Sequence, residues 1–139
     1  MKLLKTISGM ILAVCMAAGL TFGANPSVSG YYPFWAQYSE FTPEDVRWDF
    51  YSDVIYGYFV PGDDGSVQLA DESDEQNFEN LLKKGKTNKV RVWVSLGGPG
   101  MSDAMSEMAA DEAMRSKFAS SVGELLNTHS LIAGIELSW

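Results

Sequence analysis

Hydrophobic positions after residue 24 fall into four short runs that predict β-strands. Each run is rich in β-branched and aromatic residues and is bounded by polar or glycine-containing segments. The four runs lie at 28–35, 53–60, 89–97 and 131–139. Helical signals separate them, and strands that alternate with helices are typical of a parallel α/β sheet.

Two of the helical signals lie before the third strand. Thr42 can cap a short helix, because a proline and two acidic positions follow it in the expected first turn. Ser73 and Gln76 have the spacing of a capping box, which predicts a second helix. The lysines and glycine at 83–85 predict its end. Its expected buried stripe is Phe78, Leu81 and Leu82.

A longer helical region is predicted at 102–127, with a break near Ala110 and Asp111. Methionines recur there at spacings that suit one helix face, so packing in the core is preferred to a metal or cofactor box. The acidic stretch at 63–75 lacks the alternating ligand order of a calcium loop. We therefore expect no metal site in either segment.

The first 24 residues predict an export signal. Lys2 and Lys5 precede an apolar run at 7–20, and small residues follow it. The run is short for a membrane-spanning helix, so we expect cleavage, a secreted protein, and no stable membrane insertion afterwards. A lipoprotein signal at Cys15 and an uncleaved anchor are the alternatives. The sequence thus divides into a signal peptide at 1–24 and one domain at 25–139.

Charge and cysteine content narrow the candidate partners. The chain carries a formal net charge of −8, and removal of Lys2 and Lys5 with the signal would make the domain more acidic still. Such a domain is a poor candidate for nucleic acid or an anionic lipid surface, so a neutral or cationic partner is expected. The only cysteine, Cys15, lies in the signal, which leaves the mature domain without a disulfide. About 115 residues suffice for half of a typical ~250-residue β/α barrel.

Polar residues alternate with apolar ones along the last two predicted strands. Arg91 and Ser95 share one face of the third strand, and Glu136 and Ser138 share one face of the fourth. A parallel sheet covered by helices is normally apolar on both faces, so these residues need partners or a ligand. The glycine-rich segment at 97–100 favours a binding loop. A solvent-exposed face and an ordinary turn remain the alternatives.

Each predicted strand also carries a short motif. The motifs are G-Y-Y-P-F-W at 30–35, I-Y-G-Y-F at 55–59, K-V-R-V-W-V-S-L-G-G at 89–98 and G-I-E-L-S-W at 134–139, with D-G-S-V at 64–67 in the turn after the second strand. In this order they resemble the catalytic domain of glycoside hydrolase family 18, the chitinases, whose third and fourth strands carry S-x-G-G and D-G-x-D-x-D-W-E. The resemblance implies the N-terminal half, about four β/α units, of a TIM (β/α)8 barrel.

The resemblance also implies a chemistry. In the family, a glutamic acid that ends the fourth-strand motif protonates the glycosidic oxygen, and the N-acetyl carbonyl of the substrate attacks the anomeric carbon. Configuration is retained without an enzyme nucleophile. The implied substrates are β-1,4-linked N-acetylglucosamine polymers, and neither a cofactor nor a metal is expected.

Carried over residue by residue, the family motif shows departures at the catalytic positions. Glu136 stands in place of the deeper of two aspartates, and Tyr31 and Ser95 match the residues that support its charge. Ser138 stands where an aspartate orients the acetamido group. The general acid would be residue 140, which this sequence does not contain. We therefore expect no hydrolysis by the chain as given.

Four further positions match the sugar-binding cleft of the family. Trp35 and Tyr58 correspond to aromatic residues whose flat faces can stack on sugar rings. Gly97 and Gly98 belong to the S-x-G-G loop, where we expect the backbone to approach the sugar.

Three functions remain open on the sequence alone. The first is a secreted chitinase-type enzyme of which this chain is a fragment. The second is a non-catalytic chitinase-like carbohydrate-binding protein. The third is an assembly subunit. Ser138 favours the second, because a protein that only binds sugar need not keep the aspartate. The third would need the missing half-barrel as a partner, since four parallel strands leave two open edges.

Overall fold

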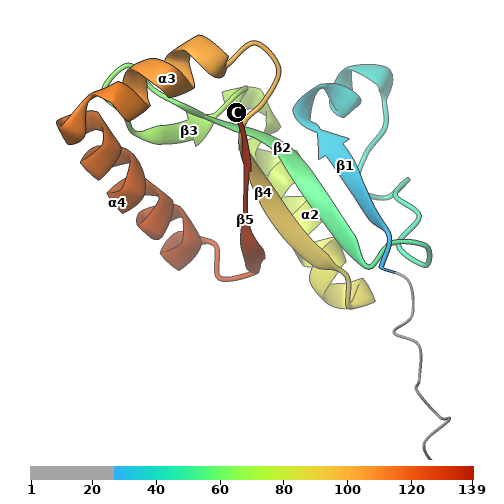
Figure 1. The fold of residues 1–139 in the computed structure, drawn as a ribbon. Coiled ribbons are helices and arrows are strands. Elements are labelled where there is room, and N and C mark those ends of the chain that lie inside the picture. The colour runs from blue at the N-terminus through green and yellow to red at the C-terminus, as the bar shows by residue number, and fades with distance from the viewer. Residues whose placement is uncertain (1–26) are drawn as a thin grey trace, which may run out of the picture.

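One five-stranded sheet organises the computed structural model, which describes residues 27–139. The predicted export signal lies outside the described residues. The strands are β1 (Ser29–Pro33), β2 (Asp53–Pro61), β3 (Val67–Leu69), β4 (Arg91–Gly97) and β5 (Ile132–Ser138). Strands β1, β2, β4 and β5 pair in that order and all run parallel, whereas β3 folds back antiparallel on β2 (Figure 1). The predicted α/β class with a parallel sheet is confirmed.

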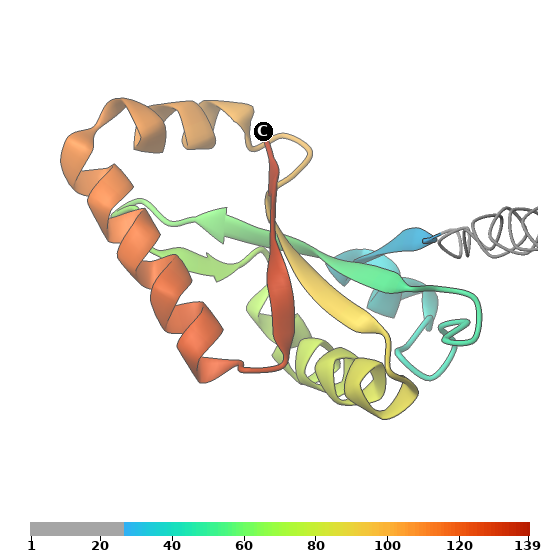
Figure 2. The same cartoon turned by 60° about the horizontal axis from the view of Figure 1, so that its bottom comes forward.

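The described residues also form three α-helices, which lie between strands along the chain. They are α2 (Glu75–Asn88), α3 (Ser102–Ala110) and α4 (Glu112–Thr128), and two short 3-10 helices, η1 (Phe34–Ser39) and η2 (Glu72–Asp74), lie in the connections. Helix α2 runs beside β4, and α3 and α4 lie on the side of β5 and the β2–β3 hairpin (Figure 2). Among the described residues, no helix is long and apolar enough to cross a membrane.

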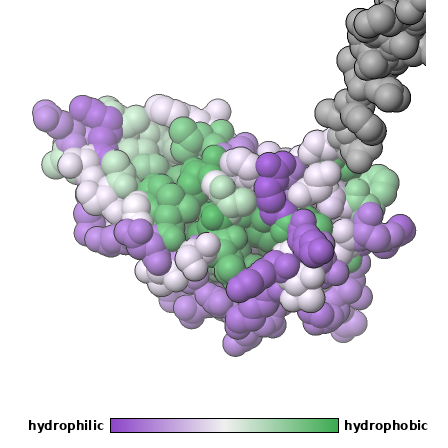
Figure 3. Space-filling view, turned by 90° about the horizontal axis from the view of Figure 1, so that it is seen from below, coloured by the Kyte–Doolittle hydropathy of each residue, from purple (hydrophilic) through white to green (hydrophobic). Residues whose placement is uncertain are grey.

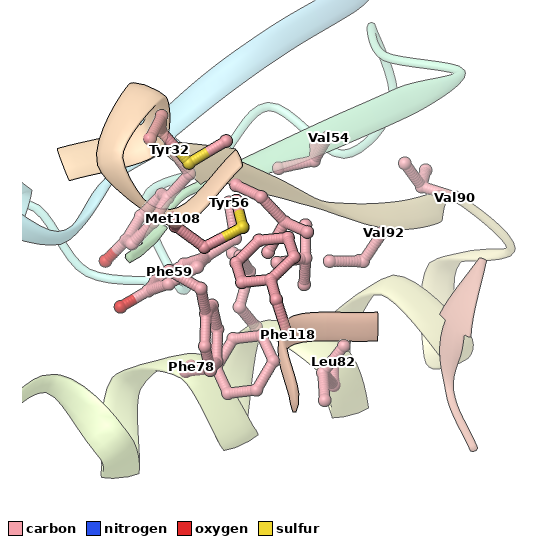
Figure 4. Packing of buried hydrophobic residues seen from close by; sticks show 14 residues of the cluster. Tyr32, Val54, Tyr56, Phe59, Phe78, Leu82, Val90, Val92, Met108 and Phe118 are labelled. Atoms are coloured by element: carbon pink, nitrogen blue, oxygen red, sulfur yellow. The ribbon is translucent and has the colours of Figure 1, made fainter. Parts of the chain in front are cut away.

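The hydrophobic core lies between one face of the sheet and these helices. Val92 and Val94 of β4 are at most 2% exposed, and the predicted α2 stripe packs against them (Figure 4). Met105 and Met108 of α3 are also buried, in agreement with the assignment of the methionines to packing. Burial of such side chains is the main stabilising contribution of the fold.

The helix predicted at Thr42 is wrong. The backbone forms turns there. The bonds of a helix start are present, because Thr42 Oγ1 accepts from the Glu44 N–H at 3.3 Å and Asp45 Oδ2 accepts from the Thr42 N–H at 2.8 Å, but no helix follows them. The Trp48 indole N–H donates to the Pro43 carbonyl at 2.9 Å, which removes an acceptor that a helix would use. Side-chain bonds of this kind compete with helical ones.

The predicted ends of α2 are also wrong, although its buried stripe is correct. Asp71 rather than Ser73 accepts the capping bond, from the Ser73 N–H at 2.8 Å, and it caps η2. The helix passes Gly85 and ends at Asn88, with Lys89 in the left-handed conformation. Gly85 therefore serves as a contact to β4 rather than as a helix stop. The break predicted near residue 111 is confirmed, because Asp111 is extended and caps α4.

Candidate functional site

The sheet face that turns away from the core carries the polar positions that the sequence singled out. Ser95 of β4 and Glu136 of β5 are neighbours in register, and Gly57 of β2 lies beside Ser95 on the other side. Tyr31 reaches this row from β1, where its hydroxyl donates to Glu136 Oε1 at 3.3 Å. Tyr31, Ser95 and Glu136 thus lie on one face of the sheet, although Tyr31 and Glu136 are 105 positions apart in the sequence.

Two acceptors in this row have no partner within the described residues. They are Glu136 Oε2 and Ser95 Oγ, both of which are buried, and Ser95 as a whole is fully buried. Ser95 therefore lies beside Glu136 but makes no hydrogen bond to it. Burial raises the pKa of the Tyr31 hydroxyl, and the negative charge of Glu136 adds to the rise. Tyr31 therefore remains a hydrogen-bond donor at neutral pH, and buried acceptors without partners are the groups that a ligand or a further chain segment would satisfy.

A second polar cluster lies at the start of the same strands. Asp53 of β2 accepts from Arg91 Nη2 at 2.8 Å and from the Trp93 indole N–H at 2.7 Å, and Arg91 Nε forms an ion pair with Asp53 Oδ1 at 2.7 Å. Burial alone would raise the pKa of Asp53, but these bonds outweigh it and hold the pKa below its ordinary value. A hollow of about 270 Å³ lies along the face between this cluster and Glu136.

The residue pattern singles out Arg91 but not its partner, because in that pattern Asp53 is only the first residue of a strand. The signal that identifies it is register: Asp53 and Arg91 are Cα partners at the start of adjacent parallel strands. Opposite charges at such positions form a pair across the strands. The alternation of residues along one strand does not contain this information.

Aromatic side chains form a cleft at the opposite end of the strands. Trp35 of η1 and Tyr58 of β2 have ring centroids 5.9 Å apart and planes inclined by 31°. Together with Gly97 and residues of the following loop they line a cavity of about 220 Å³. Trp35 is 43% exposed, so its ring remains open to a ligand. The structure thus brings together the residues that the sequence assigned to sugar binding.

Gly97 at the end of β4 and Gly98 directly after it are required by the packing around them. A Cβ on Gly97 would lie 2.3 Å from the Ser138 carbonyl oxygen, and one on Gly98 would lie 2.6 Å from the Tyr58 ring. Both residues have φ of +100°, which favours glycine. The Gly98 N–H donates to the Ser138 carbonyl at 2.9 Å. Packing against β5 and Tyr58 therefore accounts for the glycine pair without a ligand.

The remaining predictions concern Ser138 and the absence of a metal site. Ser138 ends β5 opposite Gly97 in register and is partly buried. Within residues 27–139, no group of three or more histidine, cysteine or acidic residues is arranged to hold a metal ion. In the acidic stretch, Asp64 and Asp71 accept bonds from nearby backbone N–H groups.

Comparison with known proteins places these features in a family. Residues 27–139 match the sequence model of the glycosyl hydrolases family 18. A chitinase-like effector of Moniliophthora perniciosa is 27% identical over 111 residues, which are 79% of this chain and 25% of that protein. A chitinase-like mite allergen of Dermatophagoides farinae is 25% identical over an alignment of 141 positions that covers 93% of this chain and 30% of that protein.

Solved chitinase structures have the same fold over the corresponding segment. The immunomodulatory active chitinase of Trichuris suis superposes with a TM-score of 0.72 at 26% identity, over 80% of this chain and 32% of that one. The Group IV chitinase of Ostrinia furnacalis gives 0.74 at 22% identity, over 83% and 33%. A chitinase of Cycas revoluta in complex with (GlcNAc)3 gives 0.70 at 21% identity, over 78% and 32%. The described sheet therefore matches part of a TIM barrel, and the chain spans about a quarter to a third of the length of these relatives.

Proposed function

The chain belongs to glycosyl hydrolase family 18, and we propose that it is the sugar-binding N-terminal part of a chitinase-type glycosidase for β-1,4-linked N-acetylglucosamine polymers. The observation that carries the proposal is an aromatic cleft at the end of strands whose outer face carries Glu136, a partly buried carboxylate with one oxygen unpaired among the described residues. Trp35 and Tyr58 line the cleft, and Glu136 lies on the same sheet face with Tyr31 bound to it. Sugar rings present flat C–H faces that stack on aromatic rings, and an acceptor with an unsatisfied oxygen complements an amide N–H or hydroxyl.

The same residues define what this part of the chain contributes to hydrolysis. In the family scheme, the acetamido group of the substrate attacks the anomeric carbon while a glutamic acid protonates the leaving oxygen. That acid corresponds to residue 140. Ser138 occupies the position of the aspartate that orients the acetamido group, and its hydroxyl cannot offset the positive charge of an oxazolinium. Residues 27–139 accordingly bind and position the sugar, and by themselves they do not hydrolyse it.

A non-catalytic carbohydrate-binding protein is the second candidate. Ser138 favours it, because the loss of a carboxylate that stabilises the intermediate harms catalysis more than binding. Both candidates predict binding of chito-oligosaccharides by this chain. They differ at residue 140, where the enzyme requires glutamic acid.

Export is a further part of the proposal. Its support is the sequence of residues 1–24, with a basic start, an apolar run and small residues at the end. N-terminal sequencing of protein recovered outside the producing cell should begin at residue 24 or 25. An intact Met1 on the recovered protein would contradict cleavage.

Binding and hydrolysis are tested on the same purified chain. Titration calorimetry with (GlcNAc)4 should show binding, with cellotetraose as the ligand that lacks acetamido groups. Trp35→Ala should weaken the affinity about tenfold, which corresponds to about 1.4 kcal/mol. Phe50→Ala removes another exposed aromatic residue, 58% exposed and outside the cleft, and should leave the affinity unchanged.

Hydrolysis of a chromogenic chitobioside should be undetectable under conditions in which the sugar binds. Measurable turnover that survives repurification would show that the acid lies within residues 1–139. Absence of binding to any chito-oligosaccharide would instead reject the sugar-binding proposal itself.

A further inference from the structure

The 3-10 helix η1 carries one wall of the aromatic cleft but is held only loosely by the hydrophobic core. None of its six residues is buried, and only Phe34 and Ala36 pack partly against the core. Helices of this type are shorter and have poorer hydrogen-bond geometry than α-helices. The direction in which η1 presents Trp35 to Tyr58 therefore depends on contacts other than core packing.

Tyr38 of η1 is fixed by a hydrogen bond to a residue outside the helix. Its hydroxyl donates to Asp71 Oδ2, and Asp71 lies between β3 and η2. Apolar surface by itself does not single out a residue, since the view from below shows a broad hydrophobic area with hydrophilic margins (Figure 3). Tyr38 is 65% exposed and does not line the cleft. Its bond to Asp71, rather than its apolar ring, is therefore the feature that connects it to the site.

Trp35 and Tyr38 lie on the same side of η1. They are three residues apart, and side chains at this spacing are aligned one above the other in a 3-10 helix. A bond that holds the Tyr38 side chain consequently limits rotation of η1 about its axis. The direction of the Trp35 ring is limited with it.

Asp71 is also tied to the other wall of the cleft. The N–H of Ala70 donates to the Tyr58 carbonyl at 3.0 Å, and Ala70 itself lines the cleft. Asp71 Oδ1 accepts from the Ser73 N–H at 2.8 Å, which orients the carboxylate as the cap of η2. The bonds from Tyr38 and Ser73 hold the pKa of Asp71 below its ordinary value, so its acceptor is ionised at neutral pH. One carboxylate thus joins the backbone beside Tyr58 to η1.

We propose that Asp71 is a positioning residue for sugar binding, which sets the Trp35 ring against Tyr58 through its bond to Tyr38. This role rests on the proposed function, because it concerns the same aromatic cleft. Asp71 does not touch the sugar; it keeps the two rings at their separation of 5.9 Å and inclination of 31°. A cleft whose walls are already aligned loses less freedom when a ligand binds, and affinity rises accordingly.

Two single variants break the bond from either side. Tyr38→Phe removes the hydroxyl and keeps the ring, whereas Asp71→Ser removes the acceptor for Tyr38 and keeps an N-cap oxygen for η2. Each should weaken the affinity for (GlcNAc)4 in titration calorimetry about threefold to tenfold, the range that one hydrogen bond contributes. Tyr51→Phe is the matched control, because it removes a tyrosine hydroxyl outside the cleft and should leave the affinity unchanged. Circular dichroism checks that each variant folds.

The double variant separates positioning from direct contact with the sugar. If Tyr38 acts through Asp71, Tyr38→Phe has no further effect on affinity in the Asp71→Ser background, so the two losses are not additive. Additive losses would overturn the proposal, because the Tyr38 hydroxyl would then act independently of Asp71. Full affinity in both single variants, beside a loss in Trp35→Ala, would also overturn it and would leave the proposed function standing.

The indole N–H resonance of Trp35 in a nitrogen–proton correlation spectrum tests the positioning without any sugar. Trp35→Ala identifies this resonance by its loss. Tyr38→Phe and Asp71→Ser should both shift it, because the ring current of the neighbouring Tyr58 depends on how the two rings are aligned. Tyr51→Phe should leave it in place. An unchanged resonance in both variants would overturn the positioning role even if no chito-oligosaccharide binds, a result that would separately reject sugar binding.

Discussion

Replacement of Gly85 by alanine should destabilise the fold, although alanine is the better helix former. Gly85 lies within α2 and faces β4, where an added Cβ would be 2.3 Å from Val92 Cγ2 and 3.0 Å from the Val90 carbonyl oxygen. Val92 is 2% exposed and packed in the core, and the Val90 carbonyl belongs to the backbone. Neither neighbour can withdraw without moving the helix away from the sheet.

Two contributions of opposite sign decide how far Gly85→Ala changes the free energy of unfolding. The exchange of glycine for alanine in a helix interior stabilises by about 1 kcal/mol. An extra methyl group in a packed core costs about 1–3 kcal/mol. Carbon atoms in contact prefer about 3.5–4.0 Å, and the 2.3 Å approach lies so far inside this distance that the cost falls in the upper part of the range. The free energy of unfolding should therefore fall by about 1–2 kcal/mol.

Gly123 is the matched control, because it lies within α4 and a Cβ there would meet nothing within 4 Å. Gly123→Ala should raise the free energy of unfolding by up to about 1 kcal/mol. Urea unfolding followed by circular dichroism, at one fixed protein concentration, measures both variants. The two substitutions should act in opposite directions. Equal stabilisation by both would mean that α2 does not pack on β4 at Gly85.

Two further substitutions test the two ends of the polar face. Asp53→Asn should lower the free energy of unfolding by about 1–2 kcal/mol at pH 7, a modest loss because the Arg91 side chain is 61% exposed and its pairing is screened. The folded-state pKa of Asp53 lies below its unfolded value. The stabilisation by Asp53 is therefore present above its unfolded-state pKa and is lost as the pH falls through its folded-state pKa. The difference in free energy of unfolding between wild type and Asp53→Asn, measured by urea unfolding, should therefore shrink on acidification. A gap that widens in acid would contradict this sign. Gly98→Ala should weaken chito-oligosaccharide binding several-fold in calorimetry, because its Cβ displaces the Tyr58 ring. Gly100→Ala also has positive φ but meets nothing within 4 Å, so equal losses of binding in both variants would assign the effect to backbone strain alone.

Much of the sheet could be predicted because its signals are local. The alternation along 89–97 identifies β4 and separates the buried Val92 and Val94 from Ser95 on the other face. The same alternation puts Glu136 on the polar face of β5. The helix ends were predicted less well. Thr42 makes the bonds of a helix start but only turns follow it, and the Ser73 N–H donates to Asp71, which takes the capping position. Capping patterns report only which bonds are available.

The sequence by itself determined the four parallel strands, the polar positions of the last two and the family, since each depends on residues close together in the chain, but it did not predict the short antiparallel β3. Only the tertiary structure decided which polar residues meet. Asp53 joins Arg91 through the register of β2 and β4, and Tyr31 reaches Glu136 because the sheet curves. Register and curvature depend on contacts between distant segments, and no local pattern encodes them.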